Sequence, residues 1–550
     1  ISQVLSATAG FQAYKSGGPQ SLTRAFLRGN ETDHTLVLIN GIKIVDSSTG
    51  RGSVDLERLK VTGVERIEVL RGSQSAIYGS EAIGGVINII LKRGTIKPVK
   101  YLNLEASNRL DKDISTGFSG NVEDLYFAVN YNHSEGPGIS AAEKSLGYHE
   151  NDSYDIDSAN LVLDYDLNTS TELSLITRVF ISENEEDAAP SGPFLDADRN
   201  SNLLDWQSAL SLNKKYELFS VNASIETARA RRYQLKNARK FRWYIADLNI
   251  GKLKFTVPVN TKEKFIFGVE TERAHMDTQD QYNAYDFKVS SSSSFYSYTN
   301  NTIKNLFLDG SFRSNHHDLF GLSTTYRVAA SYIISDSGFR LHSSFGTGYR
   351  APTLDEIYGS YGSITIKEET SRSRDIGIEY SSLNKNFVTD LTFFSTQIDN
   401  LIGYGPAPGY KFSNQGSAQN NGIEVFMKYI PNNNIIINSH YNFLTTNNNG
   451  RSLSRRKKHS GKTSINWVPE DLNMLSINSI AEYHSNARDG AFAGGHIAGY
   501  ALFHSNVNYT VDVNTKVQFK IENVLDQNYS EADTAGTYGR TLSLSLKLTF

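Results

Sequence analysis

Acidic side chains gather in one short stretch in the first half of the chain. Its carboxylates are Glu183, Glu185, Glu186, Asp187, Asp196 and Asp198. Carboxylate oxygens are the ligands that Ca²⁺ prefers in proteins, so the candidate calcium ligands are Glu183, Glu185, Asp187, Asp196 and Asp198. A solvated acidic loop has the same composition and is the commoner structure. The stretch therefore indicates either a calcium-binding loop or an exposed acidic loop.

A basic stretch follows from Arg229 to Arg242, with the sequence RARRYQLKNARKFR. Its arginines and lysines are interleaved with aromatic residues, and such side chains bind phosphate and carboxylate groups. We expect a loop that binds lipopolysaccharide phosphates or an anionic ligand, or that pairs with the acidic loop. The high density of cations argues against calcium in this part of the molecule.

Catalytic motifs are missing from the sequence. It contains neither the Gly-x-Ser-x-Gly nucleophile elbow nor a Walker phosphate-binding loop. The 550 residues include no cysteine and have a net charge of −4, which excludes structural disulfides and does not favour a nucleic-acid partner. We therefore expect neither an enzyme nor a nucleic-acid-binding protein.

Polar and apolar residues alternate from about Gly94 to the C-terminus, between turns rich in Asn, Asp, Ser and Gly. Typical segments are LYFAVNY, from Leu125 to Tyr131, and KFIFGVE, from Lys264 to Glu270. A period of two indicates strands with one polar and one apolar face. A soluble β-sandwich alternates in the same way, but several hundred residues without a break favour a large membrane barrel. No apolar run reaches the length of about 18 residues that a transmembrane helix needs.

The last nine residues, LSLSLKLTF from Leu542 to Phe550, decide between these two architectures. Every second residue is apolar, and the residues between are Ser, Lys or Thr. In water, such an apolar row on an edge strand would promote aggregation. We therefore expect this face to lie in lipid.

The N-terminal part of the chain has a different pattern. Short apolar runs end in glycine turns, as in TLVLI before Asn40-Gly41 and in GVINII after Gly84. Asn-Gly after an apolar strand is a strong hairpin signal, and β-branched runs indicate strands that are buried on both faces. We also expect a short helix within the first 11 residues, ending at Gly10. The pattern predicts a small mixed α/β domain.

Four motifs in this part resemble the plug domain of TonB-dependent outer-membrane receptors, in that family's order and approximate spacing. They are FLRG (26–29), LVLINGIKI (36–44), VERIEVLRG (64–72) and AIYGSEAIGGVINII (76–90). Barrel segments of the same family are similar to FGTGYRAPTL (345–354), NQGSAQNNGIE (414–424) and NVLDQNY (523–529). Glu368-Glu369 is a local departure, because relatives usually have Pro-Glu there.

The resemblance implies an all-β transmembrane fold, a 22-stranded antiparallel β-barrel occluded by an N-terminal mixed α/β plug domain. The expected boundaries are 1–94 for the plug and 95–550 for the barrel. We expect the family's N-terminal TonB-coupling segment and the signal peptide to be missing from this chain, as in a processed or trimmed protein. The implied location is the outer membrane of a Gram-negative bacterium. The chain is expected to be a monomer there, inserted by the barrel-assembly machinery and energised by TonB and its inner-membrane complex.

The resemblance also implies two sets of site residues. The outward plug turns that would contact a ligand contain Ser16, Gly17, Gly18, Asn30, His34, Ser47, Ser48, Thr49, Gly50 and Arg51. The second set would lock the plug to the barrel wall, through Arg28 and Arg71 on the plug and Asp375 and Glu424 on the wall. Arginine–carboxylate pairs would hold the plug and still let it be released without breaking an apolar core.

The substrate implied by the resemblance is cobalamin or a related corrinoid, because the chain is most similar to the cobalamin receptors of the family. No cofactor is required for such transport, although the family's cobalamin receptors hold structural calcium in their loops. The basic stretch favours a ferric siderophore or another metal complex as the alternative. A passive porin or an adhesin would retain the barrel but would not need the plug motifs.

Overall fold

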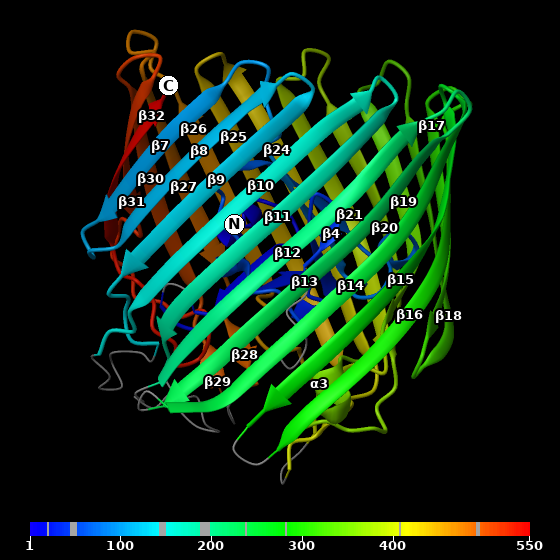
Figure 1. Ribbon diagram of the computed structural model, residues 1–550. Helices are drawn as coiled ribbons and strands as arrows, with labels where there is room; N and C mark the ends of the chain where they lie inside the picture. Colours follow the sequence, from blue (N-terminus) through cyan, green and yellow to red (C-terminus); the bar gives the residue numbers. More distant parts are fainter. Residues whose placement is uncertain are drawn as a thin grey trace.

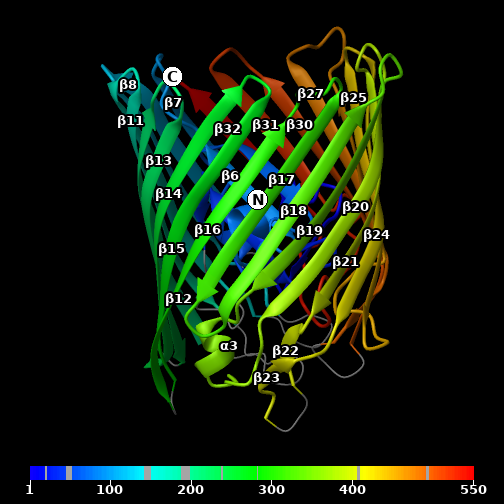
Figure 2. The same cartoon turned by 90° about the vertical axis from the view of Figure 1, so that its right-hand side faces the viewer.

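The computed structural model describes residues 1–18, 21–44, 52–141, 150–186, 199–236, 239–280, 283–405, 409–490 and 495–550. Within these residues, 22 antiparallel strands form one closed barrel, in which each strand pairs with its neighbours in the chain. The last strand, β32, pairs with the first, β7, and closes the ring. Figures 1 and 2 show the strongly tilted strands and the N-terminal elements that fill the interior. The expected 22-stranded barrel with an N-terminal plug is confirmed.

The barrel strands share one up-and-down course from Val99 to Thr549. They are β7 (Val99–Ser107), β8 (Lys112–Val122), β9 (Leu125–Gly136), β10 (Tyr154–Asn168), β11 (Thr171–Glu185), β12 (Arg199–Lys215), β13 (Ser220–Lys236), β14 (Arg239–Asn260), β15 (Glu263–Gln279), β16 (Ala284–Asn300), β17 (Leu306–His317), β18 (Gly321–Ile333), β19 (Phe339–Arg350), β20 (Glu369–Ser381), β21 (Phe387–Asp399), β24 (Ala418–Asn432), β25 (Ile435–Asn448), β26 (His459–Trp467), β27 (Leu475–His484), β30 (Tyr500–Thr510), β31 (Thr515–Glu522) and β32 (Thr541–Thr549).

The two ends of the barrel differ in their connections. At one end, strands join through short turns, such as the one between Val122 and Leu125. At the other end, longer connections carry the helix α3 (Leu354–Tyr358) and the small hairpins β22 (Ile402–Tyr404) with β23 (Phe412–Asn414) and β28 (Ala487–Asp489) with β29 (Gly495–Ile497). In outer-membrane barrels the short turns face the periplasm and the long loops face outward. We therefore call these the periplasmic and outer ends.

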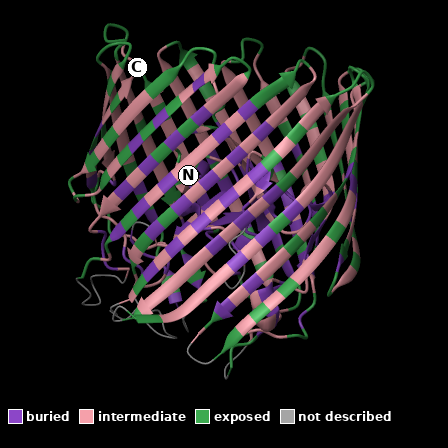
Figure 3. Cartoon of the chain, viewed as in Figure 1, coloured by how far each residue is buried: buried purple, intermediate pink, exposed green. Residues whose placement is uncertain are grey.

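Burial alternates along the strands, as the sequence predicts (Figure 3). On β32, Ser543 and Ser545 are buried inside the barrel, whereas Leu544 is 57% exposed on the outer wall. Phe550, just after this strand, is 71% exposed. No helix in the described parts of the chain is long and apolar enough to cross a membrane. The apolar rows on the outside of the barrel form the surface that contacts lipid.

The plug is built from a hairpin and a mixed four-stranded sheet. The hairpin pairs β1 (Phe11–Lys15) with β2 (Thr23–Leu27). The sheet has the order β4-β3-β6-β5, in which β3 (Thr35–Ile39) and β6 (Gly85–Leu91) run parallel. Its outer strands are β4 (Ile42–Lys43) and β5 (Val64–Arg71). The remaining elements are short helical turns, namely α1 (Ser2–Leu5), η1 (Thr32–His34), η2 (Leu56–Arg58) and α2 (Ser75–Tyr78).

The first helix is shorter than the sequence suggests. It ends at Leu5, and a series of turns leads on to Gly10. Leu5 is 2% exposed and packs with Ile87 and Ile89 of the central plug strand. Ala128 and Val162 of the barrel wall belong to the same apolar core. Apolar packing against the wall therefore fixes one part of the plug. Ionic contacts, described in the next subsection, attach other parts.

Candidate transport site

The plug lock brings together two arginines of the plug and two carboxylates of the barrel wall. Arg28 binds Glu424 through both Nε and Nη2, each at 3.0 Å, and its Nη1 lies 3.0 Å from Asp375. Arg71 Nη1 lies 2.7 Å from the same Glu424 carboxylate. Arg28 is 3% exposed and Glu424 is 1% exposed. The structure therefore places all four residues of this set in one contact network, with Arg28 at its centre.

The local backbone explains how Arg28 reaches both carboxylates. Arg28 follows β2 and has a φ of +53°, a left-handed conformation that is unusual for a residue other than glycine. Its N–H donates to the carbonyl oxygen of Gly10 at 2.8 Å. A Cβ on Gly10 would lie 2.0 Å from Glu424 Oε1. Gly10 is therefore the position where the plug backbone makes room for the carboxylate, a requirement that the sequence analysis missed.

A second ionic group, which we call the outer cluster, consists of Asp33, His34, Arg350, Glu356 and Glu369. Arg350 binds Glu356 through two nitrogens at 2.9 and 3.0 Å and lies 3.1 Å from Asp33. It also pairs with Glu369, whose carboxylate accepts a 2.9 Å hydrogen bond from His34 Nε2. All five side chains are at most 2% exposed. Since η1 supplies Asp33 and His34, the cluster ties the plug to the outer end of the barrel.

Charge in the outer cluster is unbalanced. Three carboxylates face one arginine and one histidine, so a negative charge is in excess even when His34 is protonated. Burial by itself lowers the pKa of His34, but the carboxylates of Glu369 and Asp33 outweigh burial and raise its pKa above the usual value. Asp33, His34 and Glu369 offer closely spaced ligand atoms for a metal ion, but the Arg350 guanidinium already pairs with one oxygen of each of the two carboxylates.

The predicted ligand-contacting residues divide into four groups. Gly17 and Gly18 lie against the connection that follows β9, where an added Cβ would come within 2.9 Å of Ala141 and 2.7 Å of Ile139. Ser16 donates from Oγ to the carbonyl of Leu22 at 3.1 Å. Asn30 and His34 are both 0% exposed and bonded within the protein. The remaining predicted positions, Ser47, Ser48, Thr49, Gly50 and Arg51, lie outside the described residues.

Burial changes the interpretation of Asn30 and His34. Asn30 donates from its side chain to the carbonyl of Leu27 at 2.8 Å and accepts a longer contact from Asn420. With His34 bonded to Glu369, neither side chain presents a surface to a ligand in this structure. The two residues attach the plug to its surroundings, and their contact with a ligand stays a prediction.

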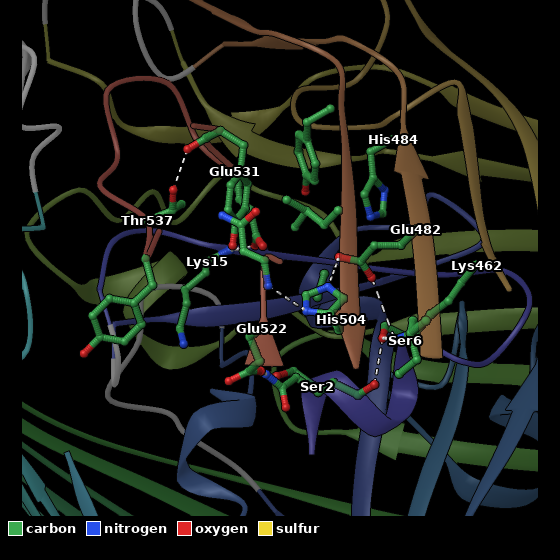
Figure 4. Close-up of a pocket in the computed structure, with 18 of the residues that line it drawn as sticks. Ser2, Ser6, Lys15, Lys462, Glu482, His484, His504, Glu522, Glu531 and Thr537 are labelled. Atoms are coloured by element: carbon green, nitrogen blue, oxygen red, sulfur yellow. Dashed lines mark hydrogen bonds and ion pairs between the residues drawn. The ribbon is translucent and has the colours of Figure 1, made fainter. Parts of the chain in front are cut away.

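A polar cavity of about 440 Å³ lies between α1 and β1 of the plug and strands β25 to β32 of the wall. Gly17 and Gly18 line it, together with alternating cations and anions (Figure 4). Lys462 donates to Ser6 at 2.7 Å, and His504 Nε2 lies 3.6 Å from Glu482. This side of the plug therefore meets the wall through polar groups around open space, unlike the packed side formed by the apolar core.

The acidic and basic stretches take different positions from those expected. Asp187, Asp196 and Asp198 lie outside the described residues. Glu183 and Glu185 belong to β11, where they accept hydrogen bonds from Asn202 and from the Ser153 backbone at 3.2 and 2.8 Å. Most of the basic stretch is not a loop but the outer part of a long hairpin, because β13 continues to Lys236 and β14 starts at Arg239. Its side chains therefore alternate between the inside and the outside of the barrel.

A closed 22-stranded barrel with a plug held in its lumen by ionic contacts defines a gated outer-membrane receptor. Residues 102–524 match the family model for the TonB-dependent receptor-like β-barrel, and residues 1–86 match the TonB-dependent receptor plug domain. The chain belongs to the TonB-dependent receptor family. Its members are outer-membrane transporters that depend on TonB, and they are not enzymes.

The individual relatives share 25% or less of their sequence with this chain. The chain is 25% identical to the vitamin B12 transporter BtuB of Photobacterium profundum, over 98% of this chain and 88% of that protein. The ferric enterobactin receptor PfeA of Pseudomonas aeruginosa superposes with a TM-score of 0.85 at 17% identity, covering 100% of this chain and 96% of that one. The copper transporter OprC gives a TM-score of 0.86 at 15% identity, with the same coverage. The two structural comparisons show a shared fold.

Proposed function

We propose that this receptor imports cobalamin or a related corrinoid across the outer membrane. The observation that carries the proposal is the similarity to a vitamin B12 transporter along 98% of the chain. The structurally similar siderophore and copper receptors share less sequence, at 15–17% identity. Similarity of fold alone does not distinguish among these substrates, since one fold serves many ligands.

The basic hairpin supports this order of candidates. The cations of this hairpin support an anionic metal complex as the substrate only where they face the lumen or the outer opening of the barrel. In the structure Arg229 and Arg231 flank the buried, inward-facing Ala230 on β13 and project outward. They therefore face away from the lumen. This removes part of the argument for a ferric siderophore, which remains the second candidate.

Transport in this proposal depends on release of the plug lock. The lock borders a cavity of about 870 Å³ that Arg71, Asp375 and several barrel strands line. Water in that cavity can solvate the ions as they separate, which makes an ionic lock easier to open than an apolar core. TonB would supply the work, and the corrinoid would be bound by the plug turns and loops at the outer end.

Binding of defined ligands tests the proposal directly. The purified full chain would be titrated with cyanocobalamin, ferric enterobactin and Cu²⁺, and tryptophan fluorescence would report binding. We expect sub-micromolar binding of cyanocobalamin and much weaker binding of the other two. Tight binding of ferric enterobactin or Cu²⁺, with none of cyanocobalamin, would replace the corrinoid with that ligand. Uptake of labelled cyanocobalamin by cells with and without TonB would then test energy coupling.

Calcium remains a separate proposal. Glu183 and Glu185 are the described members of the candidate set, and both are exposed on β11. If calcium binds these carboxylates, then adding a chelator should lower the thermal stability of the protein. The double variant Glu183→Gln/Glu185→Gln should lose that response to the chelator. An equal response in both proteins would exclude these two ligands.

A further inference from the structure

We infer that the polar cavity between the plug and strands β25 to β32 binds a small zwitterion, a solute that carries one carboxylate and one ammonium group. We call it the β25–β32 cavity. Its volume of about 440 Å³ lies within the range of small-ligand pockets, about 300–1,000 Å³. Such a solute is far smaller than a corrinoid or a ferric siderophore, so this site is separate from the transport site at the outer end.

Charged side chains of both signs line the β25–β32 cavity in equal number, four lysines and four glutamates. Six of them form ion pairs with one another. These pairs are Lys15 with Glu57 at 3.6 Å, Lys462 with Glu482 at 3.7 Å and Lys520 with Glu522 at 3.4 Å. One residue of each sign is left over, and these two are Lys457 and Glu531.

Lys457 is the cation left over. It lies in the connection between β25 and β26 and is 2% exposed. Its Nζ donates to the Tyr500 hydroxyl at 2.6 Å and lies 4.6 Å from the centre of the same ring. It forms no ion pair with any carboxylate of the described residues. Because an ammonium buried without an opposite charge is costly, this group favours an anionic partner.

Glu531 is the anion left over, in the connection between β31 and β32. Its carboxylate accepts a 2.8 Å hydrogen bond from the backbone N–H of Lys15, but no cation among the described residues pairs with it. Burial raises the pKa of Glu531 and lowers the pKa of Lys457, and the attraction between the two reduces these shifts without reversing them. Two groups of opposite sign therefore face one cavity, each without a charged partner in contact.

A third side chain of the cavity also lacks a partner. The Nδ1 atom of His484 is enclosed and has no hydrogen-bond partner among the described residues. The His484 ring lies 4.9 Å from the ring of Tyr500, the residue that Lys457 contacts. Figure 4 shows His484 and Glu531 among the side chains around the cavity. Depending on its tautomer, Nδ1 donates to a carboxylate or accepts from an ammonium group.

A zwitterion satisfies these groups better than a simple ion does. Its carboxylate would bind Lys457 and its ammonium would bind Glu531, each through a charge-assisted hydrogen bond. A free anion would leave Glu531 unpaired, and a free cation would leave Lys457 unpaired. Either ion would also add net charge to a cavity whose lysines and glutamates are equal in number. Amino acids and their longer-chain analogues are solutes of the matching class.

Such an occupant would stabilise the plug as well as the wall. Strand β1 of the plug contacts both unpaired residues: Gln12 Nε2 donates to the backbone carbonyl of Lys457 at 2.9 Å, and the Lys15 N–H donates to Glu531. A solute that bridges Lys457 and Glu531 would hold the two outer connections together beside β1. Because it binds the folded arrangement and not the unfolded chain, it should raise the thermal stability of the protein.

The test measures the binding of small probes to the full-length receptor in detergent, by ligand-observed NMR titration and by thermal unfolding. Glycine, β-alanine and γ-aminobutyrate are zwitterions with an increasing distance between the charges. Acetate, ethylammonium and acetamide are the anionic, cationic and uncharged control probes. The variants are Lys457→Met and Glu531→Gln. Lys520→Gln is the control variant, because it removes a lysine of the same cavity that is already paired.

We expect at least one zwitterion to bind about tenfold more tightly than every control probe and to raise the temperature of unfolding. Lys457→Met and Glu531→Gln should each weaken that binding about tenfold or more, since each removes one charge-assisted hydrogen bond. Lys520→Gln should stay within about twofold of the parent, because its ion pair is not part of the site.

Failure of all the zwitterions to bind, or equal binding of zwitterions and control probes, would overturn the inference. Zwitterion binding that persists in both Lys457→Met and Glu531→Gln would place the solute elsewhere on the receptor and would overturn it too. Acetate binding as tight as that of the best zwitterion would replace the zwitterion site with an anion site. Glu531→Gln keeps an acceptor for the Lys15 N–H, so this variant carries the test by itself if Lys457→Met does not fold.

Discussion

The plug lock and the outer cluster both join plug to barrel through arginine and carboxylate, but they differ in charge balance and in access to water. The lock pairs two arginines with two carboxylates. Arg28 and Glu424 are as buried as the outer cluster, but the side chains of Arg71 and Asp375 are 31% and 11% exposed. The outer cluster surrounds one arginine with three carboxylates and a histidine, all at most 2% exposed. A balanced, partly wet contact can open at low cost, whereas a buried and unbalanced one cannot. We infer that the lock is the releasable attachment and the outer cluster the permanent one.

The largest effect should follow from removing the arginine of the outer cluster. Arg350→Met leaves three buried carboxylates without their common partner, at a cost of about 3–5 kcal/mol or more. Thermal unfolding of the purified protein would measure the loss. Arg340→Met is the matched control, because Arg340 lies on the same strand and pairs with Glu379 at 2.6 Å, but its side chain is 38% exposed. The control should cost less than about 1 kcal/mol. Similar losses in both variants would remove the distinction between buried and exposed attachments.

The next effect concerns the lock itself. In a double-mutant cycle on Arg71→Ala and Glu424→Ala, each single change removes the 2.7 Å contact between these residues. Because the pair shares one carboxylate with Arg28, we expect a coupling energy of about 1–2 kcal/mol, well above the scatter of about 0.5 kcal/mol for independent sites. The cycle would be read from the thermal stability of the plug inside the barrel. Additive effects would show that Arg71 merely lies near Glu424 without stabilising the lock.

The plug lock and the outer cluster also differ in how far they can be predicted from the sequence. The lock residues lie in motifs that resemble a known family, so the sequence pointed to all four of them. The sequence analysis misses the outer cluster, although Arg350 lies within FGTGYRAPTL and Glu369 belongs to the Glu368-Glu369 pair that replaces the usual Pro-Glu. Its members are spread from Asp33 to Glu369 and meet only after the barrel closes around the plug. Thr353 and Glu356 also form a helix capping box, which accounts locally for a glutamate that additionally binds Arg350.

The barrel itself was predictable for a simpler reason. Alternation with a period of two is a property of each strand alone, as in LSLSLKLTF before the C-terminus. The length of a strand cannot be predicted from that strand alone, because it depends on pairing. The pairing of β13 with β14, for example, continues through a polar stretch to Lys236 and Arg239. This is why the basic hairpin was mistaken for a loop. Hydrogen bonding between the two strands extends beyond the apolar residues that mark the membrane.

A smaller effect tests how closely the plug backbone fits the lock. Gly10→Ala would place a Cβ 2.0 Å from Glu424 Oε1 at a φ of +81°, so the carboxylate must move away from Arg28. We expect a loss of about 2 kcal/mol from backbone strain and the displaced hydrogen bonds together. Gly41→Ala is the control, because Gly41 has a φ of +83° with nothing within 4 Å of the added Cβ. It should show the backbone strain alone, about 1 kcal/mol. Equal losses at the two glycines would mean that Glu424 moves freely.

The smallest expected effect is a dependence on pH that only the outer cluster should show. The pKa of His34 is raised in the folded protein, since the attraction of Glu369 and Asp33 outweighs the effect of burial. Two neighbours oppose protonation. One is the positive charge of Arg350, which the two carboxylates outweigh. The other is the Glu31 backbone N–H facing His34 Nδ1, which at 3.3 Å is long and weak. A raised histidine pKa contributes stability that is fully present below about pH 6.5, the unfolded value, and is lost as the pH rises through the folded pKa.

The free energy of unfolding should therefore fall between about pH 6.5 and the raised pKa of His34, by about 1.4 kcal/mol for each unit of pKa shift. His34→Gln keeps a donor for Glu369 but cannot titrate, so its stability should be flat across the same range. Denaturant unfolding at several pH values would compare the two proteins. Arg71→Gln serves as the control from the lock, and it should retain the slope of the parent because no histidine contacts that arginine among the described residues. The same slope in the parent and in His34→Gln would show that His34 is neutral throughout, and the excess negative charge of the outer cluster would then have to be neutralised by a proton on one of its carboxylates.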